Sequence, residues 1–320
     1  MMRRNGLTGV VLLVVCVLIV YMGYLMKDIL TLQQRIEEEK KPEMLNGRPH
    51  IIMIGEVEDH LYWNIVRDAA KDYAQENELY LQYKGPRDSD PDEQLSILRR
   101  VIDVQPDGII VQSLTEAFIP LIDEAISLDI PVITVDSDQP MSQRVSYVGT
   151  DNLLAGEAIA EDVLAHVDDV HAGIITGTYT NYHHQLRLEG FKEVIDQAGD
   201  ASIVDVASSG IKRVNAREKA YQMMINHPEI NVMLGISALD VLGITEAIDV
   251  LGREDIYVVG FDTLEENLQL LKQGKVQTLA SQEPHQMGMK SMEIIEKIIQ
   301  GESVPDVIHT NSQLVKDGSS

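Results

Sequence analysis

Short apolar runs alternate along most of the chain with longer segments in which apolar residues recur every three or four positions. The short runs, such as residues 51–55 and 131–136, are rich in β-branched residues and are typical of buried parallel strands. The longer segments, such as residues 63–76, have one apolar face and are typical of helices. Because strands and helices alternate, we expect a parallel sheet that is covered by helices and wound by right-handed crossovers.

This alternation occurs twice along the chain. In each set a proline, Pro106 or Pro228, lies just before a buried strand, and the last strand ends on an aspartate, Asp136 or Asp262. The sequence therefore predicts two similar α/β lobes, with one long continuous sheet as the alternative. The expected strands are 51–55, 79–83, 108–112, 131–136, 171–177, 202–206, 231–235 and 256–262. The expected helices are 63–76, 92–104, 116–128, 186–198, 216–226 and 239–251.

Regular patterns also occur between the two sets and after them. Residues 150–166 are expected to form a helix that joins the lobes and is capped by Asp151 or Asn152. Near the C-terminal end, a helix pattern at 287–300 precedes an apolar run around 307–308. An apolar tail of this kind must pack against something, so we expect it to return to the first lobe.

The N-terminal run at residues 7–26 contains no charged residue and follows Arg3 and Arg4. About 20 apolar residues match a membrane-spanning helix, and the preceding arginines place the N-terminus in the cytoplasm. A cleaved secretory signal and a lipoprotein signal at Cys16 are alternatives, but the run lacks a small-residue cleavage site and Val15 precedes the cysteine. We expect a single-pass membrane protein with its binding domain outside the cell: a cytoplasmic segment at 1–6, an uncleaved anchor at 7–26 and a stalk at 27–48.

Composition and motifs narrow the classes of function. The formal net charge is −25, from 26 basic and 51 acidic residues, so a nucleic-acid partner is not expected. Cys16 is the only cysteine, which excludes disulfides and thiolate metal sites from the remaining chain. The adjacent His183 and His184 raise the question of a metal site with Asp59 and His60, but adjacent histidines point in different directions on most backbones. We expect no metal and no cofactor.

Four motifs then occur in order along the chain: DIPVITVD (129–136), GTDN (149–152) with Ala155-Gly156 after it, RLEGF (187–191) and VVGFD (258–262). With these motifs, residues 50–316 resemble the type 1 periplasmic sugar-binding proteins, the ribose-binding group especially, which share the core fold of lactose-repressor-type regulators. The repressors begin with a helix-turn-helix, whereas this chain has an apolar run there. The resemblance implies a doubly wound two-lobe α/β fold with three hinge crossings, near Gly149, Glu283 and Thr310. It implies a first lobe at 49–149 plus 283–309 and a second at 150–282 plus 310–317.

The resemblance also implies a ligand site between the lobes. Asp136, Arg187 and Asp262 match positions at which the family binds ligand oxygens, and Gln282 matches a hinge position that is often glutamine. These residue types suit a sugar, because charged acceptors and planar donors bind hydroxyl groups. Tyr62, Trp63, Ser237, His60 and Glu56 complete the expected site.

Several of these residues depart from the ribose-binding pattern. His60 stands where relatives have asparagine, Ser237 also replaces an asparagine, and Ser137 follows the first aspartate where arginine is frequent. Glu56 lies at the mouth of the first strand and, with His60, indicates a different ligand. Trp63, the only tryptophan, is expected to stack on the ligand, with packing in the core as the alternative. Tyr62 is expected either beside Trp63 at the ligand or in the core at the helix start.

The second lobe has no ring at Ile211, where the resemblance would place an aromatic residue. Aromatic rings on both sides of the ligand are therefore not expected unless Tyr179 or Tyr182 substitutes for it.

The resemblance implies a solute-binding protein that clamps a monosaccharide or a sugar-like small molecule and presents it to an ABC-type permease. The alternative is a ligand-sensing partner of a membrane histidine kinase, or a binder of a furanosyl signalling molecule. An enzyme acting on sugars would need an acid and a base flanking the scissile bond. Asp136 and Asp262 could imitate that pair, but the family binds without reaction, so we do not expect an enzyme.

Overall fold

The structure is a computed structural model, and it describes residue 22 and residues 47–316. The expected membrane anchor and stalk lie outside the described residues, apart from residues 22, 47 and 48. Within the part that is described, no helix has both the length and the apolar character needed to cross a bilayer.

Six strands form the first sheet, and all neighbouring strands in it are parallel. Their order across the sheet is β11 (Val307–His309), β5 (Ser146–Gly149), β4 (Val132–Val135), β3 (Gly108–Val111), β1 (His50–Ile54) and β2 (Tyr80–Lys84). The helices of this lobe are α2 (Leu61–Glu76), α3 (Pro91–Val104), the short 3-10 helix η1 (Glu116–Phe118), α4 (Ile119–Ser127) and α10 (Pro284–Ile299). One apolar cluster, including Val66 and Met287, lies under α2 and α10, and another, including Leu98 and Ile122, lies under α3 and α4. Both faces of this sheet are therefore covered, as the continuous apolar runs predict.

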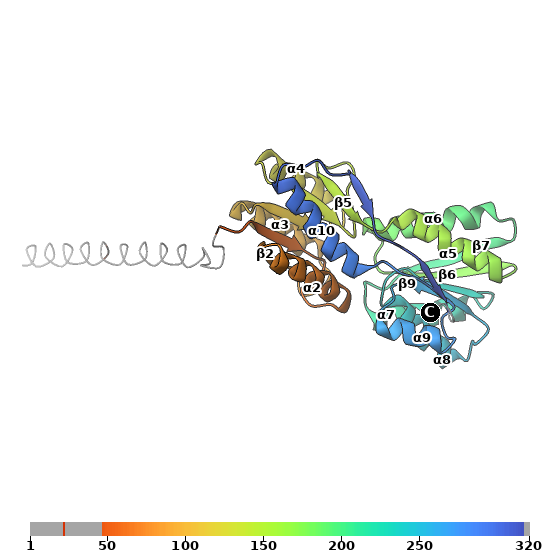
Figure 1. Cartoon of the computed structure of the whole chain (residues 1–320). Coiled ribbons are helices and arrows are strands. Elements are labelled where there is room, and N and C mark those ends of the chain that lie inside the picture. The colour runs from red at the N-terminus through yellow and green to blue at the C-terminus, as the bar shows by residue number, and fades with distance from the viewer. Residues whose placement is uncertain (1–21, 23–46, 317–320) are drawn as a thin grey trace, which may run out of the picture. The chain divides into compact units, whose positions relative to one another are not determined.

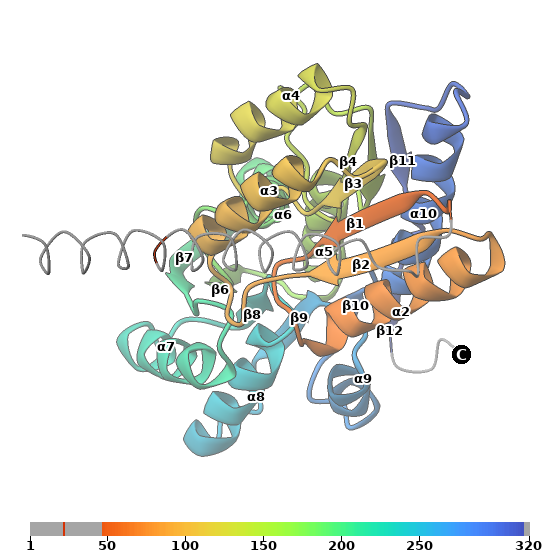
Figure 2. The same ribbon diagram turned by 90° about the vertical axis from the view of Figure 1, so that its left-hand side faces the viewer.

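The second sheet repeats this arrangement (Figure 1, Figure 2). Its order is β12 (Leu314–Lys316), β10 (Thr278–Ala280), β9 (Tyr257–Phe261), β8 (Val232–Gly235), β6 (Val170–Thr176) and β7 (Ala201–Ser208). Its helices are α5 (Asn152–His166), α6 (Tyr182–Gln197), α7 (Arg213–Asn226), α8 (Asp240–Leu251) and α9 (Glu265–Lys272). Only β12 runs antiparallel to its neighbour among the described strands. The two separate and similar sheets confirm the predicted two-lobe α/β fold and exclude one continuous sheet.

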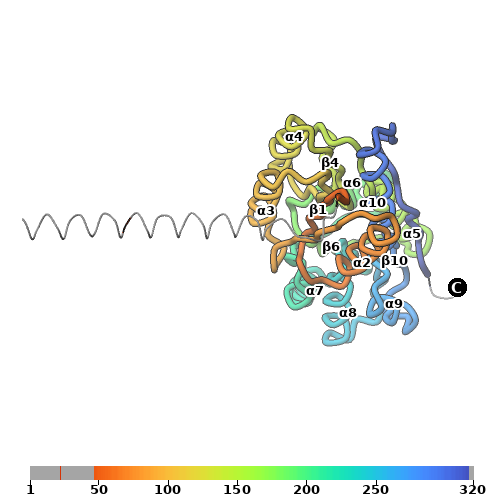
Figure 3. Tube along the Cα trace, turned by 60° about the vertical axis from the view of Figure 1, so that its left-hand side comes forward, coloured from red at the N-terminus to blue at the C-terminus, as the bar shows by residue number. Residues whose placement is uncertain are grey.

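The chain passes between the two sheets three times: from β5 to α5, from β10 to α10 and from β11 to β12. The tube trace shows the late segment, drawn in blue, running along both lobes (Figure 3). Helix α10 packs against α2, and β11 pairs with β5, so late residues complete the lobe that the early residues begin. Three connections that cross side by side are suited to a hinge.

Some expectations about individual elements were wrong. The helix expected at 186–198 begins at Tyr182, and the one expected at 116–128 starts as η1 before α4. Strands β5, β10 and β12 and helix α9 were not expected at all. Asp151, one of the two suggested caps, is the N-cap of α5, and its carboxylate accepts a hydrogen bond from Leu154 N at 3.1 Å.

Candidate ligand-binding site

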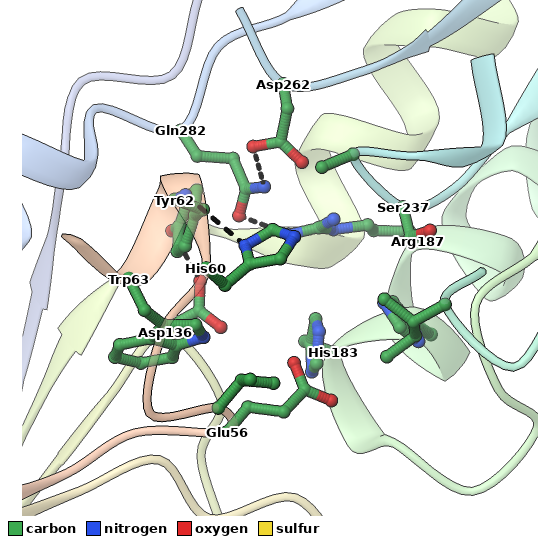
Figure 4. A pocket seen from close by; sticks show the side chains of 14 residues that line it. Glu56, His60, Tyr62, Trp63, Asp136, His183, Arg187, Ser237, Asp262 and Gln282 are labelled. Carbon is green, nitrogen blue, oxygen red and sulfur yellow. Dashed lines mark hydrogen bonds between the residues drawn. The ribbon is translucent and has the colours of Figure 1, made fainter. Parts of the chain in front are cut away.

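A pocket lies between the two lobes at the carboxyl ends of the strands, where open α/β sheets bind ligands. It holds about 460 Å³ of space that protein atoms do not fill, including its open mouth. All nine residues that the sequence singled out line this pocket, and Figure 4 shows them around it. The lining residues are Glu56, Val57, His60, Tyr62, Trp63, Asp136, His183, His184, Arg187, Ile211, Ser237, Ala238, Asp262 and Gln282.

Asp136 and Asp262 occupy equivalent positions, directly after β4 and β9. Both have a left-handed backbone, with φ of 64° and 74°. Aspartate tolerates this conformation better than most residues, and it ends the strand while the side chain faces the pocket. Both side chains are buried, with 4% of their surface exposed. The same turn, used once in each lobe, brings two carboxylates to one pocket.

Arg187, on α6, lines the pocket at a point where α5 and α6 approach each other closely. A Cβ atom on Gly156 of α5 would lie 2.2 Å from the carbonyl oxygen of Arg187. A Cβ on Gly190 of α6 would lie 2.1 Å from the carbonyl oxygen of Leu153. Only glycine allows such contact between helix backbones. The glycines of two sequence motifs therefore set the position of the arginine of the second motif.

The Arg187 guanidinium is held by four groups. Its Nε donates to Asn152 Oδ1 at 2.8 Å, one terminal nitrogen donates to the Ile236 carbonyl at 3.0 Å, and the other donates to Gln282 Oε1. The guanidinium carbon lies 4.4 Å from the centre of the Phe261 ring, a cation–π contact. Within the described residues, Arg187 makes no ion pair with either pocket aspartate.

Gln282 connects Arg187 to the second-lobe aspartate. Its Nε2 donates to Asp262 Oδ1 at 2.6 Å, while its Oε1 accepts from Arg187. The other oxygen of Asp262 has no hydrogen-bond donor among the described residues. This free acceptor faces the pocket, so it is available to a hydroxyl group.

Asp136 is held by two donors from the first lobe. Tyr62 donates its hydroxyl to Oδ1 at 2.6 Å, and Gln112 Nε2 donates to Oδ2 at 2.7 Å. Trp63 packs edge-on against Tyr62, with ring centres 5.8 Å apart, and 2% of Trp63 is exposed. A Cβ on Gly55 would lie 2.7 Å from Trp63 Cε3, so the indole lies against the end of β1. Trp63 and Tyr62 thus belong to the core and also line the pocket.

Glu56 joins the two lobes. Its Oε1 accepts hydrogen bonds from Ser89 Oγ at 2.7 Å and from Asn181 Nδ2 at 3.0 Å, and Asn181 lies just before α6 in the second lobe. A second direct bond between the lobes runs from Tyr182 N to the Leu114 carbonyl at 2.9 Å. The lobes are therefore in contact around the pocket.

His60 and Ser237 form hydrogen bonds with residues near them in the sequence. The His60 ring caps α2, and its Nδ1 accepts from Tyr62 N at 3.3 Å. Ser237 follows β8, and its backbone N–H donates to Asp240 Oδ2 at 2.8 Å. Its buried hydroxyl has no hydrogen-bond partner in the described part of the chain.

Burial changes the protonation of the pocket groups. It raises the pKa of Glu56 to about 7, with a further increase from the charge of Asp136. It also raises the pKa of Asp262 to about 6, although the nearby Arg187 opposes this shift. Burial lowers the pKa of His183 well below its ordinary value and that of His184 to about 3, so both rings are neutral.

His183 and His184 both line the pocket, with ring centres 4.1 Å apart. The expectation that adjacent histidines diverge was wrong here, because the start of α6 turns both rings inward. His183 lies four residues before Arg187 on one helix, and residues at that spacing share a helix face. This spacing was the signal in the sequence that would have placed His183 at the site. Among the described residues no group of three or more metal-ligating side chains is assembled.

Neither of the two tyrosines considered from the sequence replaces the missing ring at Ile211. Ile211 itself lines the pocket, with a left-handed φ of 56°. Tyr179 is 54% exposed and donates its hydroxyl to the Val206 carbonyl at 3.0 Å, and neither it nor Tyr182 lines the pocket. The rings that the second lobe contributes are the two imidazoles.

Two similar α/β lobes, with polar side chains from both facing a shared pocket, define a two-lobe binding protein. Residues 51–303 match the family model of the periplasmic binding protein domain, and the chain belongs to this family.

The chain is similar in sequence or structure to several proteins of known name. The ribose import binding protein RbsB of Salmonella typhimurium is 28% identical over 177 residues, which cover 55% of this chain and 59% of that protein. GanP, a glucose-galactose binding protein from Geobacillus stearothermophilus, is 38% identical, with a TM-score of 0.83 and coverage of 85% of this chain and 99% of GanP. A chain of the XylFII–LytSN complex is 25% identical, with a TM-score of 0.81, and the match covers 85% of this chain and 99% of that chain.

Proposed function

We propose that the chain binds a monosaccharide or a sugar-like polar molecule in the pocket between its lobes, without chemical reaction. The observation that carries this proposal is the pocket itself, in which Asp136, Asp262 and Arg187 are buried among amide and aromatic side chains. Charged acceptors and planar donors of this kind suit a small polyhydroxylated molecule, because they bind hydroxyl groups. The names of RbsB and GanP, both sugar-binding relatives, support the same class of ligand.

Each group has a definite part in the proposed binding. The free oxygen of Asp262 accepts a ligand hydroxyl, and Asp136 accepts another beside the Tyr62 hydroxyl. A hydrogen bond to a charged group contributes roughly 1.5–3 kcal/mol. Trp63 and Tyr62 offer flat apolar surface to the C–H groups of a sugar ring. Two or three such bonds with this contact give micromolar affinity, about −8 kcal/mol.

Closure of the lobes forms part of the proposed mechanism. A ligand between Asp136 of the first lobe and Asp262 of the second contacts both lobes, so it binds the closed arrangement better than an open one. The bond between Glu56 and Asn181 also exists only when the lobes meet. The ligand therefore shifts the population towards the closed form about the three crossings. We place the lobe boundaries at 49–149 plus 283–309 and at 150–282 plus 310–317.

We also propose that residues 7–26 anchor the protein in the cell membrane, with residues 27–48 as a stalk and the binding lobes on the extracytoplasmic face. The expected partner of the closed form is an ABC-type sugar permease, which the name of the import protein RbsB favours. A membrane sensor is the second candidate. It is favoured by the XylFII–LytSN complex, in which a chain of similar fold is bound to another protein.

Isothermal titration of the full chain with D-ribose, D-glucose, D-galactose and D-xylose tests the proposed site. We expect one of these sugars to bind, and Asp262→Asn to weaken that binding about tenfold or more through loss of a charged acceptor. Asp200→Asn is the matched control, because Asp200 is exposed and does not line the pocket. Equal affinity of the wild type and Asp262→Asn would remove Asp262 from the site.

A further inference from the structure

Two buried polar atoms of the pocket lining have no hydrogen-bond partner within the described part of the protein: Nδ1 of His183 and Oγ of Ser237. Each side chain has 4% of its surface exposed. A buried polar atom without a partner destabilises the folded protein, because it has lost its bonds to water. In a pocket, a polar group of a bound molecule can supply the missing bond.

His183 differs in this respect from the ring beside it. His184 Nδ1 accepts a hydrogen bond from Thr178 N at 3.3 Å, so the backbone fixes that ring. No such bond reaches His183 Nδ1 from the residues described. Burial and the neighbouring Arg187 keep the His183 ring neutral by lowering its pKa. A neutral imidazole has one N–H donor and one acceptor nitrogen, a combination that matches a hydroxyl group.

Glu56, on the first lobe, lines the same pocket as this ring. In Figure 4 its carboxylate is drawn beside His183, on the opposite side of the pocket from Asp262 and Gln282. Ser89 and Asn181 both donate to Glu56 Oε1, and this fixes the direction of the carboxylate. A hydroxyl between the two side chains would be held by one residue from each lobe.

We infer that His183 and Glu56 form a second polar subsite of the pocket, which binds one hydroxyl group of a sugar or polyol between the two lobes. The inference rests on the proposed function, and it identifies a specificity-determining residue that the family resemblance does not supply. A sugar that lacks a hydroxyl at this end keeps its bonds to Asp136 and Asp262 but leaves His183 without a partner. The subsite therefore selects among sugars that the aspartates alone would not distinguish.

The test uses the full chain and the tightest-binding probe among D-ribose, D-glucose, D-galactose and D-xylose. His183→Leu keeps a similar volume but removes the unpaired nitrogen. We expect its Kd for the probe to rise about tenfold, the size of one hydrogen bond in a dry site. The Tm of the free protein should stay the same or rise, because a destabilising atom has been removed. His171→Leu, outside the pocket on β6, is the control for loss of a histidine.

Two further measurements separate a ligand contact from a structural role. Effects of Glu56→Gln and His183→Leu on Kd should not multiply in the double variant, because both residues bind one group. The second measurement uses derivatives of the probe that each lack one hydroxyl group. We expect one of them to bind the wild type about tenfold more weakly than the probe does. His183→Leu should bind that derivative and the probe with equal affinity.

The Kd and Tm of His183→Leu decide the inference. An unchanged Kd in His183→Leu overturns it, as does a lowered Tm with an unchanged Kd, which marks a purely structural histidine. Binding that is sensitive to Asp262→Asn but not to His183→Leu leaves the proposed function standing and removes the subsite. Absence of binding by any sugar overturns both. If His183→Leu does not fold, the ¹⁵N shifts of the wild-type His183 ring must change on addition of the probe, and unchanged shifts overturn the subsite.

Discussion

At the scale of single residues, the pocket concentrates acidic groups around one arginine. Asp136, Asp262 and Glu56 are all buried at the lining, and burial raises the pKa of each. Hydrogen-bond donors on a ligand stabilise a carboxylate in its charged form. The same groups that destabilise the free protein are therefore the ones that a sugar would stabilise.

The destabilisation that comes from burying the charged Glu56 carboxylate can be measured as a dependence of stability on pH. Its pKa is raised from 4.5 to about 7 in the folded chain, so between these values the folded state keeps a proton that the unfolded state has lost. The contribution of Glu56 to the free energy of unfolding therefore falls as the pH rises through this interval. Above the interval this contribution no longer changes with pH. The Tm of Glu56→Gln should consequently fall less than that of the wild type between about pH 5 and about pH 7.5.

Glu58→Gln is the control for this measurement, because Glu58 is exposed and does not line the pocket. Its pH profile should follow that of the wild type. A Glu56→Gln profile parallel to the wild type would show that Glu56 does not titrate in this interval.

The sequence was sufficient to identify the residues whose chemistry stands out from their surroundings. Asp136 and Asp262 end apolar strands, and Arg187 lies in a recognisable motif, so each was expected at the pocket where the structure places it. The binding role of these residues stays a prediction. His183 was missed because its position depends on where α6 begins, at Tyr182 rather than near 186.

At the scale of elements, the contact between α5 and α6 is the one that positions the charged site. Gly156 and Gly190 bring the two backbones together, and the interval between Gly156 and the Arg187 carbonyl leaves no room for a methyl group. Arg187 is then fixed by Asn152 from α5 and by Gln282 from the crossing before α10. Helix packing thus determines where the guanidinium lies.

Gly156→Ala tests this role. We expect it to destabilise the protein by about 1–3 kcal/mol, the usual cost of an added methyl in a filled core, and to weaken sugar binding by displacing Arg187. Denaturant unfolding and titration measure the two effects. Gly199→Ala is the matched control, because a Cβ there meets no atom within 4 Å. Equal stability of Gly156→Ala and Gly199→Ala would contradict the account of the helix contact.

Long elements were easier to predict than short ones. Helices α2 and α3 and strands β1 and β4 were expected within a few residues of their observed bounds. Each helix has a repeating apolar face, and each strand is a continuous apolar run. Strands β10 and β12 have three residues each, too few for a pattern, and they exist because β9 offers an edge with which β10 pairs. Such elements depend on tertiary pairing rather than on local sequence.

At the scale of the whole molecule, the repeat is what creates the pocket. Two sheets of the same strand order place equivalent turns at their carboxyl ends, and the three crossings hold those ends opposite each other. The repeat itself was visible in the spacing of prolines and aspartates. Two bonds between the lobes away from the crossings, Asn181 to Glu56 and Tyr182 to Leu114, join residues distant in sequence and carried no signal in the pattern.

The most direct test of ligand binding between the lobes is the fluorescence of Trp63, the only tryptophan of the chain and a residue of the pocket lining. The full chain is titrated with D-ribose, D-glucose, D-galactose and D-xylose. We predict a saturable change in Trp63 emission with at least one of them, and loss of that response in Asp262→Asn at the same concentrations. A sugar that binds by calorimetry without any change in emission would place the ligand away from Trp63. Absence of binding by every sugar would contradict the proposed function.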